Sequence, residues 1–277
     1  MYQVFFSLWV YILVGLLGLA IGSFLNCVIW RLEKQETLQG RSYCPHCKHS
    51  LAWYDVIPVA SFLWLGGLCR YCSKKISWQY PLVEIFTAII FLVVYQSQVT
   101  ILDINTVAAI IRLLLLWYVA SSLWAILVYD VKYFLIPDLV LLPVIAIVFL
   151  YRLSQVLVTH PLSFAAWWPL ISYGLAAVLA FGFFLAIYLV SRGKWMGFGD
   201  VKLAILLGLL LGLPMIAVGL FLSFLLGSVV GIGLMVFQKK GLQTQLPFAP
   251  FLIAGTVLAL LVGQPLLHWY LSLSYIS

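Results

Sequence analysis

The feature that most constrains this chain is a series of long apolar stretches separated by short polar segments. Because 65% of the residues are hydrophobic and only 8% are charged, a soluble core of this size could not hide the apolar surface. Lipid is therefore the expected solvent, and helices are expected to cross it because each one satisfies its own backbone hydrogen bonds. The stretches fall at about 5–30, 81–96, 107–129, 138–153, 167–190, 201–213, 215–237 and 249–272.

The stretches predict seven or eight membrane spans. A spanning helix needs about 20 residues, and the sixth stretch is shorter and breaks at Leu213-Pro214. The sequence therefore predicts an all-α polytopic membrane protein with about eight transmembrane helices. The first stretch lacks a basic n-region and is interpreted as a membrane helix rather than a signal peptide. The expected divisions are a first transmembrane helix (1–30), a cytoplasmic zinc-binding loop domain (31–80) and a transmembrane peptidase domain (81–277).

The positive charges predict how the helices are oriented. With eight spans, loops on one side hold 13 of the 15 Lys and Arg residues, and Arg112 and Arg152 fall near the other side. The positive-inside rule makes the first side cytoplasmic and puts the N-terminus outside. The net charge of +7 therefore indicates topology rather than a nucleic-acid partner. The residues on the cytoplasmic side are Arg31, Lys34, Arg41, Lys48, Arg70, Lys74, Lys75, Lys132, Arg192, Lys194, Lys202, Lys239 and Lys240.

Four of the five cysteines form two pairs in the predicted loop, Cys44-Pro-His-Cys47 and Cys69-Arg-Tyr-Cys72, with 21 residues between them. Two such pairs offer four thiolates that close a tetrahedron around zinc and leave no open position for catalysis. Disulfides are the alternative, but they do not persist in the reducing cytoplasm. The sequence therefore predicts a structural zinc ion, which would fold a loop too small to stabilise itself.

Three residues near these pairs are given ordinary roles. His46 and His49 could substitute as zinc ligands, but the complete set of cysteines favours solvated positions for both. Cys27 lies inside the first apolar stretch and is interpreted as a small packing residue.

The chain has only eight acidic residues, so each one can be weighed. Glu33, Glu36 and Asp55 lie in the cytoplasmic loop and Asp103 in an external loop, where solvated positions are expected. Glu84 lies early in the second span, where an acid is costly unless it faces a polar cavity or the interface. A functional role and an interfacial position favoured by the helix dipole weigh equally for this residue.

The other three acids, Asp130, Asp138 and Asp200, lie at predicted helix ends. Helix capping accounts for Asp138, which follows a proline. Asp200 ends Gly197-Phe-Gly-Asp200, where glycine permits unusual backbone conformations and close approach of another segment. If the third and sixth spans pack together, Asp130 and Asp200 share one depth and form an aspartic-protease pair that holds one proton. On these grounds alone Asp138 could replace either member.

Several motifs follow one another between residues 22 and 202. They are Gly22-Ser-Phe-Leu-Asn26 with Arg31, Gly40-Arg-Ser-Tyr-Cys44-Pro-His-Cys47, Leu51-Ala-Trp53-Tyr-Asp55-Val-Ile-Pro58, Gly67-Leu-Cys69-Arg-Tyr-Cys72, Ile76-Ser, Tyr80-Pro-Leu-Val-Glu84, Asp130 with Ile136-Pro-Asp138, and Gly197-Phe-Gly-Asp200-Val-Lys202. In this combination the chain closely resembles the bacterial type IV prepilin peptidases. These are bifunctional leader peptidase/N-methyltransferases of the GxGD aspartic membrane protease group.

The resemblance implies specific roles and two reactions. Asp130 and Asp200 would be the catalytic pair, and Asp138 a supporting residue. The enzyme would cut the short basic leader of type IV prepilins or type II secretion pseudopilins after a glycine, at the cytoplasmic face of the bacterial inner membrane. It would then methylate the new N-terminal residue with S-adenosylmethionine. No residue pattern spells out the methyl-donor site, and the cytoplasmic loop with Glu84 is the expected region.

Two other classes of protein are alternatives. A polytopic transporter also carries intramembrane acids and interrupted helices, but would place those acids near the bilayer midplane. A non-catalytic assembly factor could use the zinc loop as a docking module, but this would leave the glycines before Asp200 without a role.

Overall fold

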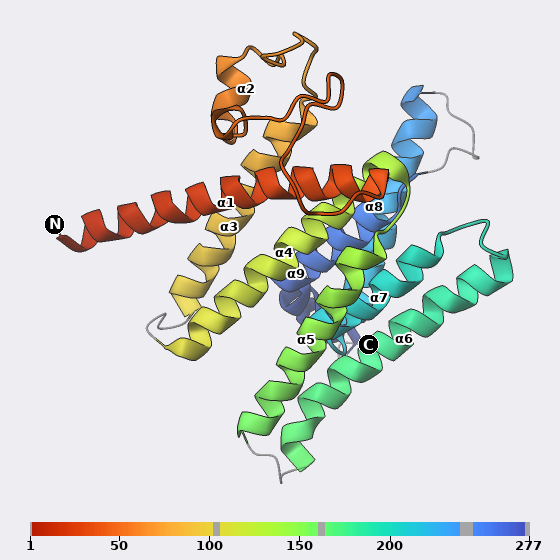
Figure 1. Ribbon diagram of the computed structural model, residues 1–277. Helices are drawn as coiled ribbons and strands as arrows, with labels where there is room; N and C mark the ends of the chain where they lie inside the picture. The colour runs from red at the N-terminus through yellow and green to blue at the C-terminus, as the bar shows by residue number, and fades with distance from the viewer. Residues whose placement is uncertain (1, 102–105, 160–163, 239–245, 275–277) are drawn as a thin grey trace. The chain divides into compact units, whose positions relative to one another are not determined.

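The computed structural model describes residues 2–101, 106–159, 164–238 and 246–274. Within these ranges the chain is helical, with two isolated β-bridges and no strand, so the predicted all-α class is confirmed (Figure 1). The elements are α1 (Tyr2–Lys34), η1 (Trp53–Asp55), α2 (Ala60–Trp64), α3 (Gln79–Ile101), α4 (Val107–Tyr133), α5 (Asp138–Thr159), α6 (Phe164–Ser191), α7 (Phe198–Leu211), α8 (Met215–Gln238) and α9 (Ala249–Ser274).

Seven of the described helices are long and apolar enough to cross a membrane, namely α1, α3, α4, α5, α6, α8 and α9. The helix formed by the sixth apolar stretch, α7, is shorter. It has 14 residues and extends about 21 Å, which is less than the hydrocarbon thickness of roughly 30 Å. The helix ends at Leu211, and the next residue, Gly212, adopts a φ of +67° just before Leu213-Pro214. The predicted break in the sixth stretch is therefore confirmed.

The chain divides into two compact units within α4. The N-terminal unit is Met1–Val128 and the C-terminal unit is Tyr129–Ser277. The first helix, the cysteine loop (residues 35–78) and α3 thus belong to one unit, because α1 packs along α3. The three-part functional division at residues 30 and 80 stays a prediction.

Glycines allow α1 and α3 to pack closely in the N-terminal unit. A Cβ at Gly22 would lie 2.6 Å from the Cα of Glu84, so only glycine fits that distance. One turn further along, the Asn26 side chain donates from Nδ2 to the Tyr80 carbonyl oxygen at 3.0 Å. This packing places the Gly22–Asn26 motif beside the Tyr80–Glu84 motif, directly below the cysteine loop.

In the C-terminal unit α6 packs on α7 and α8 packs on α9. Small residues again permit close approach, since a Cβ at Gly208 would lie 2.4 Å from the Cα of Ala177. The helix α7 also contacts α5 and α9 and has nine buried residues. Protein surrounds most of this short helix, so it carries Asp200 into the interior of the unit.

Candidate active site and metal centre

Two buried carboxyl groups lie in the C-terminal unit, close enough to each other for an electrostatic interaction. Asp130 lies three residues before the end of α4, and Asp200 is the third residue of α7. Their exposed fractions are 5% and 8%, and the two groups interact electrostatically. Such a pair can share one proton because two ionised carboxylates would repel each other in a site that excludes water.

One of the two glycines before Asp200, Gly199, lets a neighbouring segment approach closely. A Cβ at Gly199 would lie 2.9 Å from the Cβ of Ile136. Gly197 has a φ of −75°, and neither glycine has a positive φ. Close approach is therefore the physical reason for glycine at position 199, whereas a Cβ at Gly197 would make only ordinary contacts, and the expectation of an unusual backbone conformation is wrong.

Asp138 has a different partner from the other two aspartates. It is the first residue of α5, and its carboxylate forms an ion pair with Lys202, which lies two residues after Asp200 on α7. The Asp138 side chain is half exposed. The structure therefore associates Asp130 with Asp200, and pairs Asp138 with Lys202 instead.

Sequence reasoning missed one contributor to this site. The main-chain N–H of Ala249, the first residue of α9, donates to Oδ2 of Asp130 at 3.2 Å. The available signal was Pro247-Phe-Ala-Pro250, since proline before and inside the first turn is typical of a helix start.

The four cysteines of the loop converge in the N-terminal unit. The Sγ atoms of Cys44, Cys47, Cys69 and Cys72 all lie within 4.8 Å of one another, and the Cys44 and Cys72 sulfurs are 3.9 Å apart. Zinc with four thiolates at about 2.3 Å requires sulfurs roughly 3.8 Å apart, so the donor set fits a tetrahedral ion. No histidine belongs to this cluster among the described residues, and His49 instead stacks on Tyr71.

The two cysteine pairs share one backbone conformation. In each, the N–H of the residue after the second cysteine bonds to the carbonyl oxygen of the first, from Lys48 to Cys44 and from Ser73 to Cys69 at 2.9 Å. Lys48 and Ser73 both have positive φ, at 60° and 55°.

The crowded thiols also affect one another. A backbone hydrogen bond from Lys74 lowers the pKa of the Cys72 thiol, but burial and the three neighbouring thiols outweigh it and raise this pKa to about 11. A bound cation would reverse this balance because thiolates are the ligand form, so metal binding would release protons.

Comparison with known proteins identifies the family of this chain. A model of the bacterial peptidase A24 N-terminal domain matches residues 16–98, and a model of the type IV leader peptidase family matches residues 117–232. The chain belongs to the type IV leader peptidase family. A protein of Aeromonas salmonicida (strain A449) named prepilin leader peptidase/N-methyltransferase is 34% identical, with 95% of each chain covered. Proteins of the same name from Bacillus subtilis (strain 168) and Pseudomonas aeruginosa are each 30% identical, with 93% and 92% of this chain and 96% and 91% of theirs covered. No solved structure matches.

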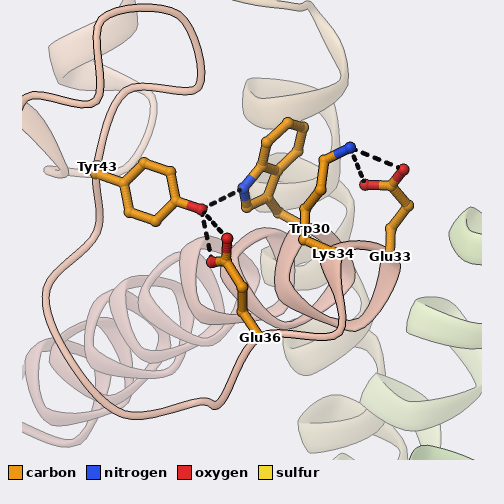
Figure 2. Close-up of polar contacts among 5 residues, drawn as sticks. All are labelled: Trp30, Glu33, Lys34, Glu36 and Tyr43. Carbon is orange, nitrogen blue, oxygen red and sulfur yellow. Dashed lines mark hydrogen bonds and ion pairs between the residues drawn. The ribbon is translucent and has the colours of Figure 1, made fainter.

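In this leader peptidase family member, the C-terminal end of α1 organises the start of the cysteine loop. The buried Arg31 guanidinium donates to four carbonyl oxygens, those of Thr37, Gln39, Gly40 and Arg41, at 2.8–3.0 Å. Figure 2 shows a second set of contacts, in which the Tyr43 hydroxyl donates to Glu36 at 2.6 Å and accepts from Trp30 Nε1 at 3.4 Å. Beside it, Lys34 pairs with Glu33 at 3.0 Å.

Asp55 ties the middle of the loop to the second cysteine pair. Its side chain is only 2% exposed and accepts from Arg70 Nε at 2.7 Å and from the Tyr71 hydroxyl at 3.0 Å. Burial would raise the pKa of Asp55, but hydrogen bonds from Arg70, the Ala52 N–H and Tyr71 together hold this pKa below its usual value. The expectation that Asp55 is solvated is therefore wrong, because these contacts form only after the loop has folded.

Glu84, on α3, connects this helix to the cysteine loop. The residue is 7% exposed, and its Oε2 accepts the main-chain N–H of Val59 at 2.7 Å. Val59 has a φ of +59°, which is strained for a β-branched residue. Glu84 is thus buried and anchors the loop to α3. Asp103, Lys239 and Lys240 lie outside the described residues.

Proposed function

We propose that this chain removes the short basic leader from type IV prepilins or type II secretion pseudopilins, cutting after a glycine, with Asp130 and Asp200 as the catalytic pair. The observation that carries this proposal is that two buried carboxyl groups, from α4 and α7, lie in one unit and interact electrostatically. The names of the curated relatives support the class of substrate.

The pair can perform hydrolysis with both protonation states in use. The ionised carboxylate takes a proton from water while the water oxygen attacks the scissile carbonyl carbon, and the protonated carboxyl donates to the carbonyl oxygen. Collapse of the tetrahedral intermediate breaks the C–N bond, and a proton passes to the departing nitrogen. Ala249 holds Asp130 in place, and the Asp138–Lys202 ion pair supports α7 beside it.

A second reaction, N-methylation of the new terminus, is proposed to follow cleavage. In the precursor the acceptor nitrogen is a peptide N–H whose lone pair is delocalised. Cleavage frees an α-amine with a reference pKa of about 7.7–8.0, so a useful fraction is neutral near pH 7. S-adenosylmethionine would supply the electrophilic methyl group. No binding site for S-adenosylmethionine is evident among the described residues, and the cysteine loop with Glu84 is the candidate region.

The cysteine cluster is proposed to hold one structural zinc ion through Cys44, Cys47, Cys69 and Cys72. The charge distribution supports an enzyme of the bacterial inner membrane with its active site on the cytoplasmic side and its N-terminus outside. The transporter alternative requires acids near the bilayer midplane. Asp130 and Asp200 instead lie close to helix ends, which favours a peptidase.

Leader removal by purified variants tests the catalytic pair. We expect Asp130→Asn and Asp200→Asn each to lower cleavage of a prepilin by about 10³-fold, because an amide can serve neither as the base nor as the acid. Asp138→Asn is the matched control and should keep substantial activity. Near wild-type cleavage by a folded Asp130→Asn or Asp200→Asn protein would rule out the pair, and an inactive folded Asp138→Asn protein would require a new assignment.

A further inference from the structure

The first turn of α9 directs a single main-chain donor out of the helix. The first N–H groups of a helix have no partner within the helix and must find one elsewhere. Pro250 has no N–H, and the N–H groups of Phe251 and Leu252 bond back to the Phe248 carbonyl oxygen at 3.0 and 3.2 Å. The remaining N–H, that of Ala249, donates to the Asp130 carboxylate.

An aromatic cluster fixes the direction of this donor. The Phe248 ring packs against Phe184 from α6 and Phe224 from α8, with ring centroids 6.1 and 5.4 Å apart. Phe184 is fully buried, and Ala249 itself has no exposed surface. The start of α9 is therefore held by packing that involves neither aspartate, so Asp130 meets a donor whose position is already set.

The helix dipoles make this contact chemically significant. Asp130 lies near the C-terminal end of its own helix, where the partial negative charge disfavours a carboxylate. The N-terminus of α9 presents the opposite partial charge together with a directed N–H, and a hydrogen bond to the charged form favours that form. Asp200 is a titratable group that interacts with Asp130, while Lys202 is engaged with Asp138.

We propose that the main-chain N–H of Ala249 is a positioning group of the catalytic centre, which orients Asp130 and favours its ionised form. The proposal rests on the aspartate pair of the proposed function and adds the segment Pro247–Pro250 to it. It explains why a stretch without any ionisable side chain lies against the buried carboxyl group.

Removing the N–H without changing the side chain tests this proposal. Ribosomal incorporation of lactic acid at position 249 replaces the amide N–H by an ester oxygen. Ala249→Pro removes the same N–H but leaves the Phe248 carbonyl an amide, at a helix position where proline is favoured. We expect both proteins to lose about tenfold in kcat/KM for prepilin cleavage, since the lost bond is charge-assisted. The acidic limb of the pH–rate profile should move up by about one pH unit.

Two matched controls lie in the first turn of α4, 22 and 23 residues before Asp130. Ala108 is exposed and can receive the same lactic acid ester, and Val107→Pro places proline at the first position of that helix. Both controls should keep the wild-type rate and pH profile. Size-exclusion chromatography and thermal unfolding establish which proteins are folded.

The outcomes separate this proposal from the aspartate pair. A folded position-249 ester whose acidic limb stays at the wild-type pH overturns the positioning role, even if its rate has fallen, because a structural defect would lower the rate alone. If Ala249→Pro does not fold, the ester protein decides. If Asp130→Asn still cleaves prepilin, the aspartate pair itself is wrong, whereas an inactive Asp130→Asn protein with an unaffected ester removes only the role of Ala249.

Discussion

The helix α7 and the cysteine loop hold their chemical groups by different physical means. Nine of the 14 residues of α7 are buried, so apolar packing is the main constraint on the position of Asp200, with the Asp138–Lys202 ion pair beside it. In the loop, residues 35–78, only Cys44, Phe62 and Cys69 are buried as whole residues, although the side chain of Asp55 is covered by its polar partners. The loop therefore depends on polar contacts and on its proposed metal ion. Packed membrane helices can hold a reaction centre by apolar contacts. A small water-facing segment has too little apolar core and needs polar contacts or a bound metal ion to fold.

The comparison suggests that each unit serves one of the two proposed reactions. The described contacts of Asp130 and Asp200 come from residues 129–277, and the cysteine cluster lies within residues 1–128. Damage to one unit should then leave the chemistry of the other in place. Each experiment below is designed to break or sharpen that separation.

The largest expected effect is the complete separation of the two activities in Asp200→Asn. This protein should not methylate an intact precursor, because cleavage is lost and no free amine appears. It should still methylate a pre-cleaved pilin, because the aspartates contribute nothing to methyl transfer in this proposal. The assay supplies labelled S-adenosylmethionine and mature unmethylated pilin. Absence of label with a folded protein would show that the sites are coupled or that the chain is only a peptidase.

Removal of the metal should affect the reactions in the opposite order. We expect about one zinc ion per chain by elemental analysis, and loss of that metal in Cys72→Ser, because three thiolates do not complete the tetrahedron. Methylation should fall by at least about tenfold and cleavage much less, since structural zinc contributes directly to folding of its segment. Cys27→Ser is the matched control. Protein kept reduced that contains no metal and two disulfides would contradict both the site and its cytoplasmic placement.

A smaller effect is expected from crowding at Gly199. The added Cβ of Gly199→Ala would meet Ile136 at 2.9 Å, and overpacking of this kind costs about 1–3 kcal/mol. Cleavage should fall by roughly tenfold with methylation of pre-cleaved pilin unchanged, because the strain lies beside Asp200. The double variant Gly199→Ala/Ile136→Ala should recover most of the loss. Additive effects in this double-mutant cycle would show that close approach is not the reason for the glycine.

The smallest effect is expected at the Glu84 anchor. Glu84→Ala leaves the Val59 N–H without its acceptor, which costs about 1–3 kcal/mol, whereas Glu84→Gln keeps an acceptor oxygen and should cost less. Methylation of pre-cleaved pilin should fall several-fold in Glu84→Ala, and limited proteolysis within the loop should become faster. Equal loss of cleavage and methylation would indicate that Glu84 supports the whole protein rather than the loop.

Local patterns determined much of what was predicted. Apolar stretches of the right length dictate helices in lipid whatever the packing partner, so the all-α class followed from composition and spacing alone. The convergence of the four cysteines was also predictable, because two cysteines separated by two residues can reach one ion within a single turn of chain. The shortness of α7 was visible at Leu213-Pro214, since a glycine and a proline end a helix locally.

Contacts between distant segments were decided only by the tertiary structure. Asp130, Asp138 and Asp200 all lie at helix ends in the sequence, and only the folded chain brings Asp200 into electrostatic interaction with Asp130 and pairs Asp138 with Lys202. Burial of Asp55, the bond from Val59 to Glu84 and the Ala249 donor likewise carry no residue-type signal. A main-chain N–H belongs to every residue except proline, so its partner depends on where the folded chain aims it.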